Sequence, residues 1–323
     1  MTKLTLSLGC IKYDRTRAIL DGDLTPDGIH LITREIVDHD GVWLVPIRYK
    51  IFDVAEMPLT NYMVALDEGH TDLVALPVFL SKSFRHSTIY INSFSGIECP
   101  EDLVGKRVGI GNYFGSTTLW TRGLLRDQYQ VNLEDIHWVT KNKVSAEKIP
   151  QGIQLKVLDA EQNMERLLEA GEIDALITER PPAAYGKAGS VMRLFENYKD
   201  TEMEYYQSTG IFPIRHVLVV KREIVEKHPW VSQSLCTMFS LAKRRAYLDR
   251  MFDGHSQYML PFMQNAIAET KRVFGSEDVW KYGLTNNEAT LSAFTKYCFD
   301  QGYTKKLYSF EQLFTKDSMD LLT

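Results

Sequence analysis

Cysteine is scarce in this sequence, and its spacing excludes two classes of site. The chain has only four cysteines in 323 residues, at Cys10, Cys99, Cys236 and Cys298. None of them forms a CxxC pair, which argues against a zinc ribbon and against a dithiol redox centre. Isolated cysteines of this kind are typical of free thiols in a reducing compartment.

Two further absences limit the partners. The 37 basic and 42 acidic residues are interspersed rather than blocked, so no basic stripe is present and we expect no nucleic acid as a partner. No apolar run reaches about 18 residues, so we expect no membrane association. The N-terminal residues MTKLTLSLGC lack the pattern of a secretory signal, which leads us to expect a cytoplasmic protein.

What the sequence does contain is a repeated alternation of short strands and helices. The 44% of hydrophobic residues suffices for a large core in two lobes. The strand pattern restarts near SGIECPEDLVGKRVGIG, returns in TGIFPIRHVLVV and gives way to a helical tail after Pro229. We therefore predict an α/β protein of two lobes with two chain crossovers. The predicted parts are residues 1–94 for lobe I, 95–208 for lobe II, and 209–323 for the return to lobe I.

Parallel sheets bind ligands beyond the carboxyl ends of their strands, so the strand exits carry the functional candidates. Two histidines there, His86 and His216, each begin an apolar run and each follow an arginine, Arg85 or Arg215. An imidazole in that position is either a satisfied core group or a group that transfers protons near neutral pH. The residue pattern leaves both interpretations open.

Arginines recur at the strand exits, and the loop GNYFGST precedes a helix. Each arginine alone is most simply a solvated or salt-bridged surface residue. Together they would form forked donors suited to carboxylates, and the amides at a helix start also attract anions. The candidate substrate-binding residues are Arg15, Arg17, Arg85, Arg180, Asn112, Ser116, Thr117 and Thr209.

Acidic side chains at the same exits have two interpretations. Asp14, Glu56 and Glu179 are each most simply counter-ions of nearby cations, and Glu56 is also a candidate proton acceptor. No HxH or HExxH spacing indicates a metal. The loop glycines have the spacing GxGxxxG without a following ribose-binding acid, which disfavours a dinucleotide. We predict neither a metal nor a cofactor.

Several quoted stretches resemble the 4,5-dihydroxyphthalate decarboxylase family, which is akin to the type II periplasmic-binding-protein superfamily. They are YDRTRAILDG, FDVAEMPLTNYM, PVFLSKSFRHSTIYIN, GIECPEDLVGKRVGI, DIHWVT, YYQSTGIFPIRHV, HPWVSQSL and VFGSEDVWKYGLTNNEATLSAF. FRHS and TGIFPI followed by RH are the most specific pieces. The resemblance runs from about residue 4 to the end, and it implies a type II periplasmic-binding-protein-like fold.

The same resemblance implies removal of carbon dioxide from an aromatic dicarboxylate with adjacent hydroxyls, such as 4,5-dihydroxyphthalate, to give protocatechuate without a cofactor. Such a reaction needs an acid, a base for a hydroxyl and an anchor for the retained carboxylate. His86 or His216 is the candidate acid, and Glu56 or the other histidine the candidate base. Arg15, Arg85 and Arg180 are the candidate anchors.

Two points stay open from the sequence. The alternative function is a solute-binding protein that captures an aromatic or small carboxylic acid for an ABC transporter, because the same cleft would serve it. A homo-oligomer is also open, since the tyrosine-rich stretch before residue 209 and the helical tail could each bury a partner or belong to the core.

Overall fold

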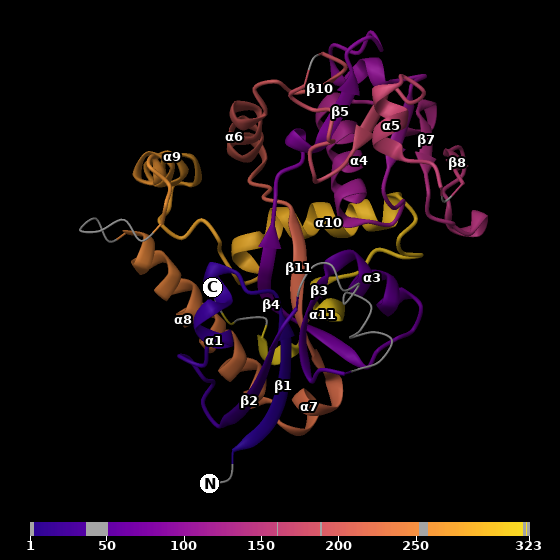
Figure 1. The fold of residues 1–323 in the computed structure, drawn as a ribbon. Coiled ribbons are helices and arrows are strands. Elements are labelled where there is room, and N and C mark those ends of the chain that lie inside the picture. Colours follow the sequence, from indigo (N-terminus) through magenta and orange to yellow (C-terminus); the bar gives the residue numbers. More distant parts are fainter. Residues whose placement is uncertain are drawn as a thin grey trace. The chain divides into compact units, whose positions relative to one another are not determined.

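The chain folds into two compact units (Figure 1). The computed structural model describes residues 3–36, 51–159, 161–187, 189–251, 258–318 and 321. Unit 1 comprises Met1–Lys82, Ile214–Leu291 and Tyr308–Thr323, and unit 2 comprises Ser83–Pro213 and Ser292–Leu307.

A mixed five-stranded sheet forms the centre of unit 1. Its strands are β1 (Leu4–Cys10), β2 (Ile29–Glu35), β3 (Val54–Pro58), β4 (Leu73–Lys82) and β11 (Ile214–Lys221), in the order β2-β1-β3-β11-β4. β1 runs parallel to β2 and β3, whereas β11 runs antiparallel to β3 and β4. The apolar residues of β4 and β11 are almost all buried, as is typical of strands covered on both faces.

Unit 1 also contains several helices. They are α1 (Asp14–Leu20), α3 (Leu59–Asp67), α7 (Arg222–Lys227), α8 (Trp230–Met251), α9 (Met263–Phe274) and α11 (Phe310–Leu313). α1 packs against α8, which also contacts β4, and α3 contacts β3 and β11 (Figure 1). Pro229 lies directly before α8, where the absence of an N–H group does not break a helix.

A second, six-stranded sheet forms the centre of unit 2. Its strands are β5 (Ile89–Asn92), β6 (Arg107–Ile110), β7 (His137–Thr140), β8 (Gln154–Val157), β9 (Ala175–Ile177) and β10 (Val191–Arg193), in the order β10-β5-β9-β6-β7-β8. β6, β7, β8 and β9 are parallel, and β5 pairs antiparallel with β9 and β10. Ile110, Leu125 and Trp138 belong to the core of this unit.

The helices of unit 2 are α4 (Ser116–Tyr129), α5 (Met164–Glu169) and α6 (Tyr198–Thr209). α4 and α5 both contact β9, and α6 contacts the 3-10 turn His86–Thr88. The helix α10 (Glu288–Asp300) begins in unit 1 and ends in unit 2.

The division of the chain differs from the sequence-based boundaries at 94/95 and 208/209. It falls at 82/83 and at 213/214, because β5 pairs with β9 and β10 and so belongs to unit 2. The chain also enters unit 2 once more, with Ser292–Leu307. This gives four passages between the units where the sequence predicted two.

Four local features of the structure differ from what the sequence pattern suggests. The strand expected from His86 onward starts at Ile89, because His86–Thr88 forms a 3-10 turn. Ser116 and Asp14 have side chains that commonly cap helices. The N-caps are instead Gly115 and Tyr13, and Ser116 and Asp14 are the first helical residues. The irregular stretch rich in tyrosine contains α6 and β10.

Candidate functional site

A buried carboxylate organises the candidate groups of unit 1. Glu56 is fully buried in β3, and its oxygens accept three hydrogen bonds. Oε2 accepts from the Ile11 N–H at 2.9 Å, and Oε1 lies 2.8 Å from the Tyr13 hydroxyl and 2.7 Å from His216 Nδ1. Glu56 therefore ties together the ends of three neighbouring strands.

The sheet register explains why Glu56 meets His216, a residue 160 positions away. Glu56 lies opposite Leu218 in the antiparallel pair of β3 and β11, and His216 lies two residues further along. Residues two apart on a strand project from the same face, so His216 and Glu56 are diagonal neighbours on one face of the sheet.

The contact with Glu56 fixes the state of the His216 ring. A carboxylate accepts a hydrogen bond, so Nδ1 is the donor in this contact. Burial and the charge of Glu56 raise the pKa of Tyr13, so the Tyr13 hydroxyl remains a donor. This arrangement is a carboxylate–imidazole pair of the kind that moves protons in enzymes.

Arg15 lies close to this pair but is held by other groups. Its guanidinium carbon is 3.9 Å from the centre of the Tyr13 ring and 4.2 Å from that of Trp280. Its Nε donates to the Leu80 carbonyl at 2.7 Å, and Nη1 is 3.2 Å from Asp14. Burial lowers the pKa of Arg15, and the residue lines a cavity of about 80 Å³.

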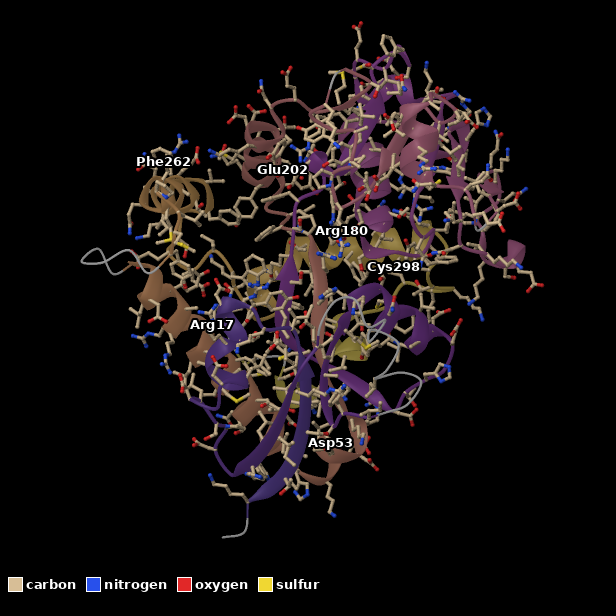
Figure 2. All side chains as sticks on the ribbon, viewed as in Figure 1. Arg17, Asp53, Arg180, Glu202, Phe262 and Cys298 are labelled. Carbon is tan, nitrogen blue, oxygen red and sulfur yellow. The ribbon has the colours of Figure 1, made fainter. Side chains whose placement is uncertain are left out.

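Arg17 lies two residues after Arg15 on α1 but has different surroundings. It is exposed on α1 (Figure 2), whereas Arg15 is mostly buried. The structure therefore does not bring Arg17 into the cluster around Glu56 and His216.

Sequence reasoning missed Lys82, the last residue of β4. Its ammonium donates to Asn287 Oδ1 at 2.6 Å and to the Lys281 carbonyl at 3.0 Å. Burial, with the nearby charge of Lys243, lowers the pKa of Lys82 to about 7. The available signal was a lysine that ends an otherwise apolar strand, a position where a charge needs compensation.

A second cluster of candidates forms in unit 2, where β9 ends and α4 begins. Arg85 is only 2% exposed, and its Nη1 lies 3.5 Å from Glu179 Oε1. The Thr117 hydroxyl donates to the same carboxylate oxygen. The structure thus brings together Arg85 and Thr117 around Glu179, the counter-ion that the sequence suggested.

The other loop and helix candidates of unit 2 are more accessible. Asn112 is exposed, with Oδ1 accepting from the Phe114 N–H at 3.0 Å, and Ser116 is half-buried at the first position of α4. Arg180 is exposed (Figure 2). The Thr209 hydroxyl donates to the Tyr205 carbonyl at 2.6 Å near the end of α6.

His86 has surroundings unlike those of His216. It is 1% exposed, and three aromatic rings surround it, those of Phe195, Tyr205 and Tyr129, with centroids at 4.9, 5.4 and 6.0 Å. Neither ring nitrogen has a hydrogen-bond partner among the described residues. Burial lowers the pKa of His86 to about 4, so its ring is neutral at pH 7.

The turn that holds His86 is tied down on both sides. Thr88 donates from its hydroxyl to the Arg85 carbonyl at 2.7 Å. Glu202 of α6, labelled in Figure 2, accepts from the Ser87 N–H at 3.0 Å. Arg85 and His86 are both buried. In a strand, adjacent side chains point to opposite faces, but here the 3-10 turn allows both to point inward.

Two features are absent from the part of the chain that the structure describes. No group of three or more His, Cys, Asp and Glu side chains there is placed to hold a metal ion. No helix there is long and apolar enough to cross a membrane.

The comparisons with known proteins identify the relatives. The chain is 31% identical over 329 residues to 4,5-dihydroxyphthalate decarboxylase of Comamonas testosteroni, covering 99% of both proteins. It is 28% identical over 216 residues to the 4,5-dihydroxyphthalate decarboxylase of Pseudomonas putida, covering 64% of this chain and 83% of the relative. The chain belongs to the 4,5-dihydroxyphthalate decarboxylase family, whose members are carboxy-lyases. No family model matches the sequence.

Solved structures show the fold. The periplasmic aliphatic sulphonate-binding protein of Escherichia coli aligns with a TM-score of 0.54 at 15% identity, over 96% of this chain and 97% of that protein. A periplasmic sulfonate-binding protein of Methylobacillus flagellatus aligns with a TM-score of 0.52 at 12% identity, over 97% and 92%. The family member thus has the predicted two-lobed fold of the periplasmic-binding-protein type, and the resemblance found in the sequence is confirmed.

Proposed function

We propose that this decarboxylase removes carbon dioxide from a hydroxylated aromatic dicarboxylate, 4,5-dihydroxyphthalate, to form protocatechuate. The observation that carries the proposal is the buried pair of Glu56 and His216, whose atoms Oε1 and Nδ1 are 2.7 Å apart. The names of both relatives support the substrate.

The chemistry requires one proton to replace one carboxyl group. In the substrate, each carboxylate-bearing carbon lies para to a hydroxyl, which can donate electrons into the ring. A proton first adds to that ring carbon. The bond between this carbon and the carboxylate then breaks, carbon dioxide departs, and the bonding electron pair returns to the ring. Positioned acids typically accelerate such steps by about 10² to 10⁴-fold.

His216 is the acid in this proposal. Its protonated Nε2 delivers the proton to the ring carbon, and the Glu56 carboxylate stabilises the imidazolium through Nδ1. Solvent then restores the proton. Because all three described contacts of Glu56 are with Ile11, Tyr13 and His216, Glu56 acts as a positioning residue rather than as the base for the hydroxyl.

The geometry favours His216 over His86 for this role. At pH 7 the His86 ring is neutral, since burial lowers its pKa to about 4, and no carboxylate among the described residues holds it in one tautomer. His86 is therefore assigned to the packing of unit 2.

The retained carboxylate binds to the cluster of unit 2. Arg85 supplies the charge, and the Thr117 hydroxyl and the Asn112 side chain supply further donors. Arginine suits this task because its fork of N–H groups matches the two oxygens of a carboxylate.

The test is the product formed from 4,5-dihydroxyphthalate by the purified protein. The proposal predicts release of carbon dioxide and appearance of protocatechuate, with many molecules formed per protein molecule. A solute-binding protein for an ABC transporter, the alternative that the fold offers, would bind the compound and leave it unchanged. Saturable binding without any product would overturn the decarboxylase function.

A further inference from the structure

The loop between β6 and α4 is held from beneath by two buried side chains of unit 2. Arg122 of α4 is fully buried, and Tyr303 is 3% exposed. Arg122 Nη2 donates to the Tyr113 carbonyl at 2.9 Å. The Tyr303 hydroxyl lies 2.8 Å from the same carbonyl oxygen and 3.0 Å from that of Gly115, so the two carbonyls share its hydrogen.

These bonds decide which way the peptide groups of the loop face. A planar trans peptide directs its N–H opposite to its carbonyl, so a carbonyl of Tyr113 held inward turns the Phe114 N–H outward. That N–H donates to Asn112 Oδ1 at 3.0 Å. With Oδ1 occupied, the exposed amide of Asn112 presents its NH₂ group, which is a donor only.

Arg122 also places a positive charge under the loop. Its guanidinium carbon lies 3.9 Å from the centre of the Tyr113 ring, and Nη2 is 3.3 Å from the Tyr303 hydroxyl. Its Nε and Nη1 have no hydrogen-bond partner among the residues the structure describes. Burial of a charge is costly, and an anion bound on the loop offsets part of that cost.

We call Arg122 and Tyr303, the two buried side chains under the loop, the brace. Tyr303 comes from the segment Ser292–Leu307, which returns to unit 2 late in the chain. Gln301 Nε2 of this segment donates to the Leu119 carbonyl of α4 at 3.1 Å. The ring of Tyr297 lies so close to Gly123 that a Cβ there would be 2.2 Å from it. The segment therefore packs along α4 and delivers the Tyr303 hydroxyl to the loop.

We infer that Arg122 and Tyr303 are positioning residues that preset the 111–116 loop, with its outward donors, for a carboxylate of the ligand. The inference rests on the proposed function, in which this loop binds the retained carboxylate. Neither residue touches the substrate. Their effect is on ligand affinity, because they hold donors in place before binding.

The experiment compares two conservative variants of buried tyrosines from the same segment, Tyr303→Phe and Tyr297→Phe. Tyr303→Phe removes the hydroxyl under the loop and keeps the ring that packs 4.9 Å from Phe114. In Tyr297→Phe the lost hydroxyl is one that interacts with Asp127, so this variant is the matched control. Three quantities are measured for the full chain: hydrogen exchange of the loop amides, affinity for phthalate as an unreactive dicarboxylate, and turnover.

We expect Tyr303→Phe to speed exchange of the loop amides and to weaken phthalate binding about tenfold, the range of one lost hydrogen bond. KM should rise with it while kcat changes less than about twofold, and Tyr297→Phe should match the wild type in all three. Exchange and affinity equal in the two variants would overturn the inference, even if both proteins released carbon dioxide. Failure of the wild type to release carbon dioxide, with the exchange and affinity effects present, would overturn the decarboxylase function and leave the brace standing.

Discussion

At the scale of single residues, the contact between Glu56 and His216 separates one histidine from the other. A carboxylate 2.7 Å from Nδ1 orients the ring of His216. His86 has aromatic neighbours instead. The sequence presents both as an imidazole that follows an arginine at the start of an apolar run, so it names the candidates without ranking them.

Glu56→Gln tests the positioning role directly. The amide keeps the size of the side chain but removes the charge that stabilises the imidazolium, so kcat should fall about 10²-fold or more with a smaller change in KM. Tyr13→Phe, which removes a neutral donor to the same carboxylate, should cost less. Steady-state kinetics of both variants provide the check, and equal small losses would contradict the role given to Glu56.

The buried ring of His86 should make the stability of the folded protein depend on pH. Its pKa is about 4 in the folded protein and about 6.5 in an unfolded chain. Between these values the unfolded chain binds the proton more readily, so stability is complete above about pH 6.5 and falls as the pH drops towards 4. The full loss is about 3 kcal/mol.

The measurement for His86 is the free energy of unfolding by urea from pH 7 to pH 4.5. Carboxylates titrate in the same range, so the relevant quantity is the difference between wild type and His86→Leu. As the pH falls, the free energy of unfolding of His86→Leu should decrease less steeply than that of the wild type. The kcat of the variant at pH 7 should remain near the wild-type value. Parallel curves, or a kcat lowered a hundredfold, would return His86 to the list of proton carriers.

Arg85→Lys examines carboxylate binding in unit 2. Lysine keeps the charge but loses the fork of donors, so KM for the dicarboxylate should rise about tenfold with kcat changed less. Arg107→Lys is the matched control, because Arg107 pairs with Asp174 at 2.8 Å in an exposed position at the start of β6. Equal KM values for wild type and Arg85→Lys would remove Arg85 from the binding site.

At the scale of elements, apolar runs were sufficient to predict most strands but not their partners. β1, β6 and β11 follow from runs of apolar residues that are in fact buried. α6 was missed because its sequence YKDTEMEYYQST has no clear apolar stripe. Periodicity also gives no reason for β5 to pair with β9 rather than with β4, since pairing depends on contacts far apart in the chain.

For the candidate site as well, the sequence indicated individual residues but not the contacts between them. Residue chemistry at strand exits was enough to name Glu56, His216 and Arg85, because ionisable groups beside apolar runs are conspicuous. Thr117 was named because it lies at the start of a helix that follows a glycine-bearing loop. The pairing of Glu56 with His216 was not predictable, since it depends on β11 lying beside β3. Arg122 and Tyr303 were also beyond prediction, because the sequence places them in an ordinary helix and in a tail.

Gly123 provides a test of the packing of α4. Alanine in place of glycine normally stabilises a helix by about 1 kcal/mol. Here a Cβ would lie 2.2 Å from the Tyr297 ring, so Gly123→Ala should instead destabilise the protein by about 1 to 3 kcal/mol. The same change combined with Tyr297→Leu should cost less than the sum of the two single changes, measured by urea unfolding. A stabilising Gly123→Ala would contradict the close packing of the return segment on α4.

At the scale of the whole molecule, the chain is a member of a decarboxylase family with a fold shared by sulfonate-binding proteins. Capture of an acid and removal of its carboxyl group require the same anion-binding groups. What distinguishes the enzyme is a proton carrier that a binding protein does not need. In the proposed mechanism, the Glu56–His216 pair is that proton carrier.

The most direct test of this account is the rate of carbon dioxide release from saturating 4,5-dihydroxyphthalate by wild type and His216→Ala, with dissociation constants measured for both. We predict that the variant binds the substrate with similar affinity and releases carbon dioxide at least about a hundredfold more slowly. A variant that binds normally and turns over at the wild-type rate would contradict the claim that His216 supplies the proton.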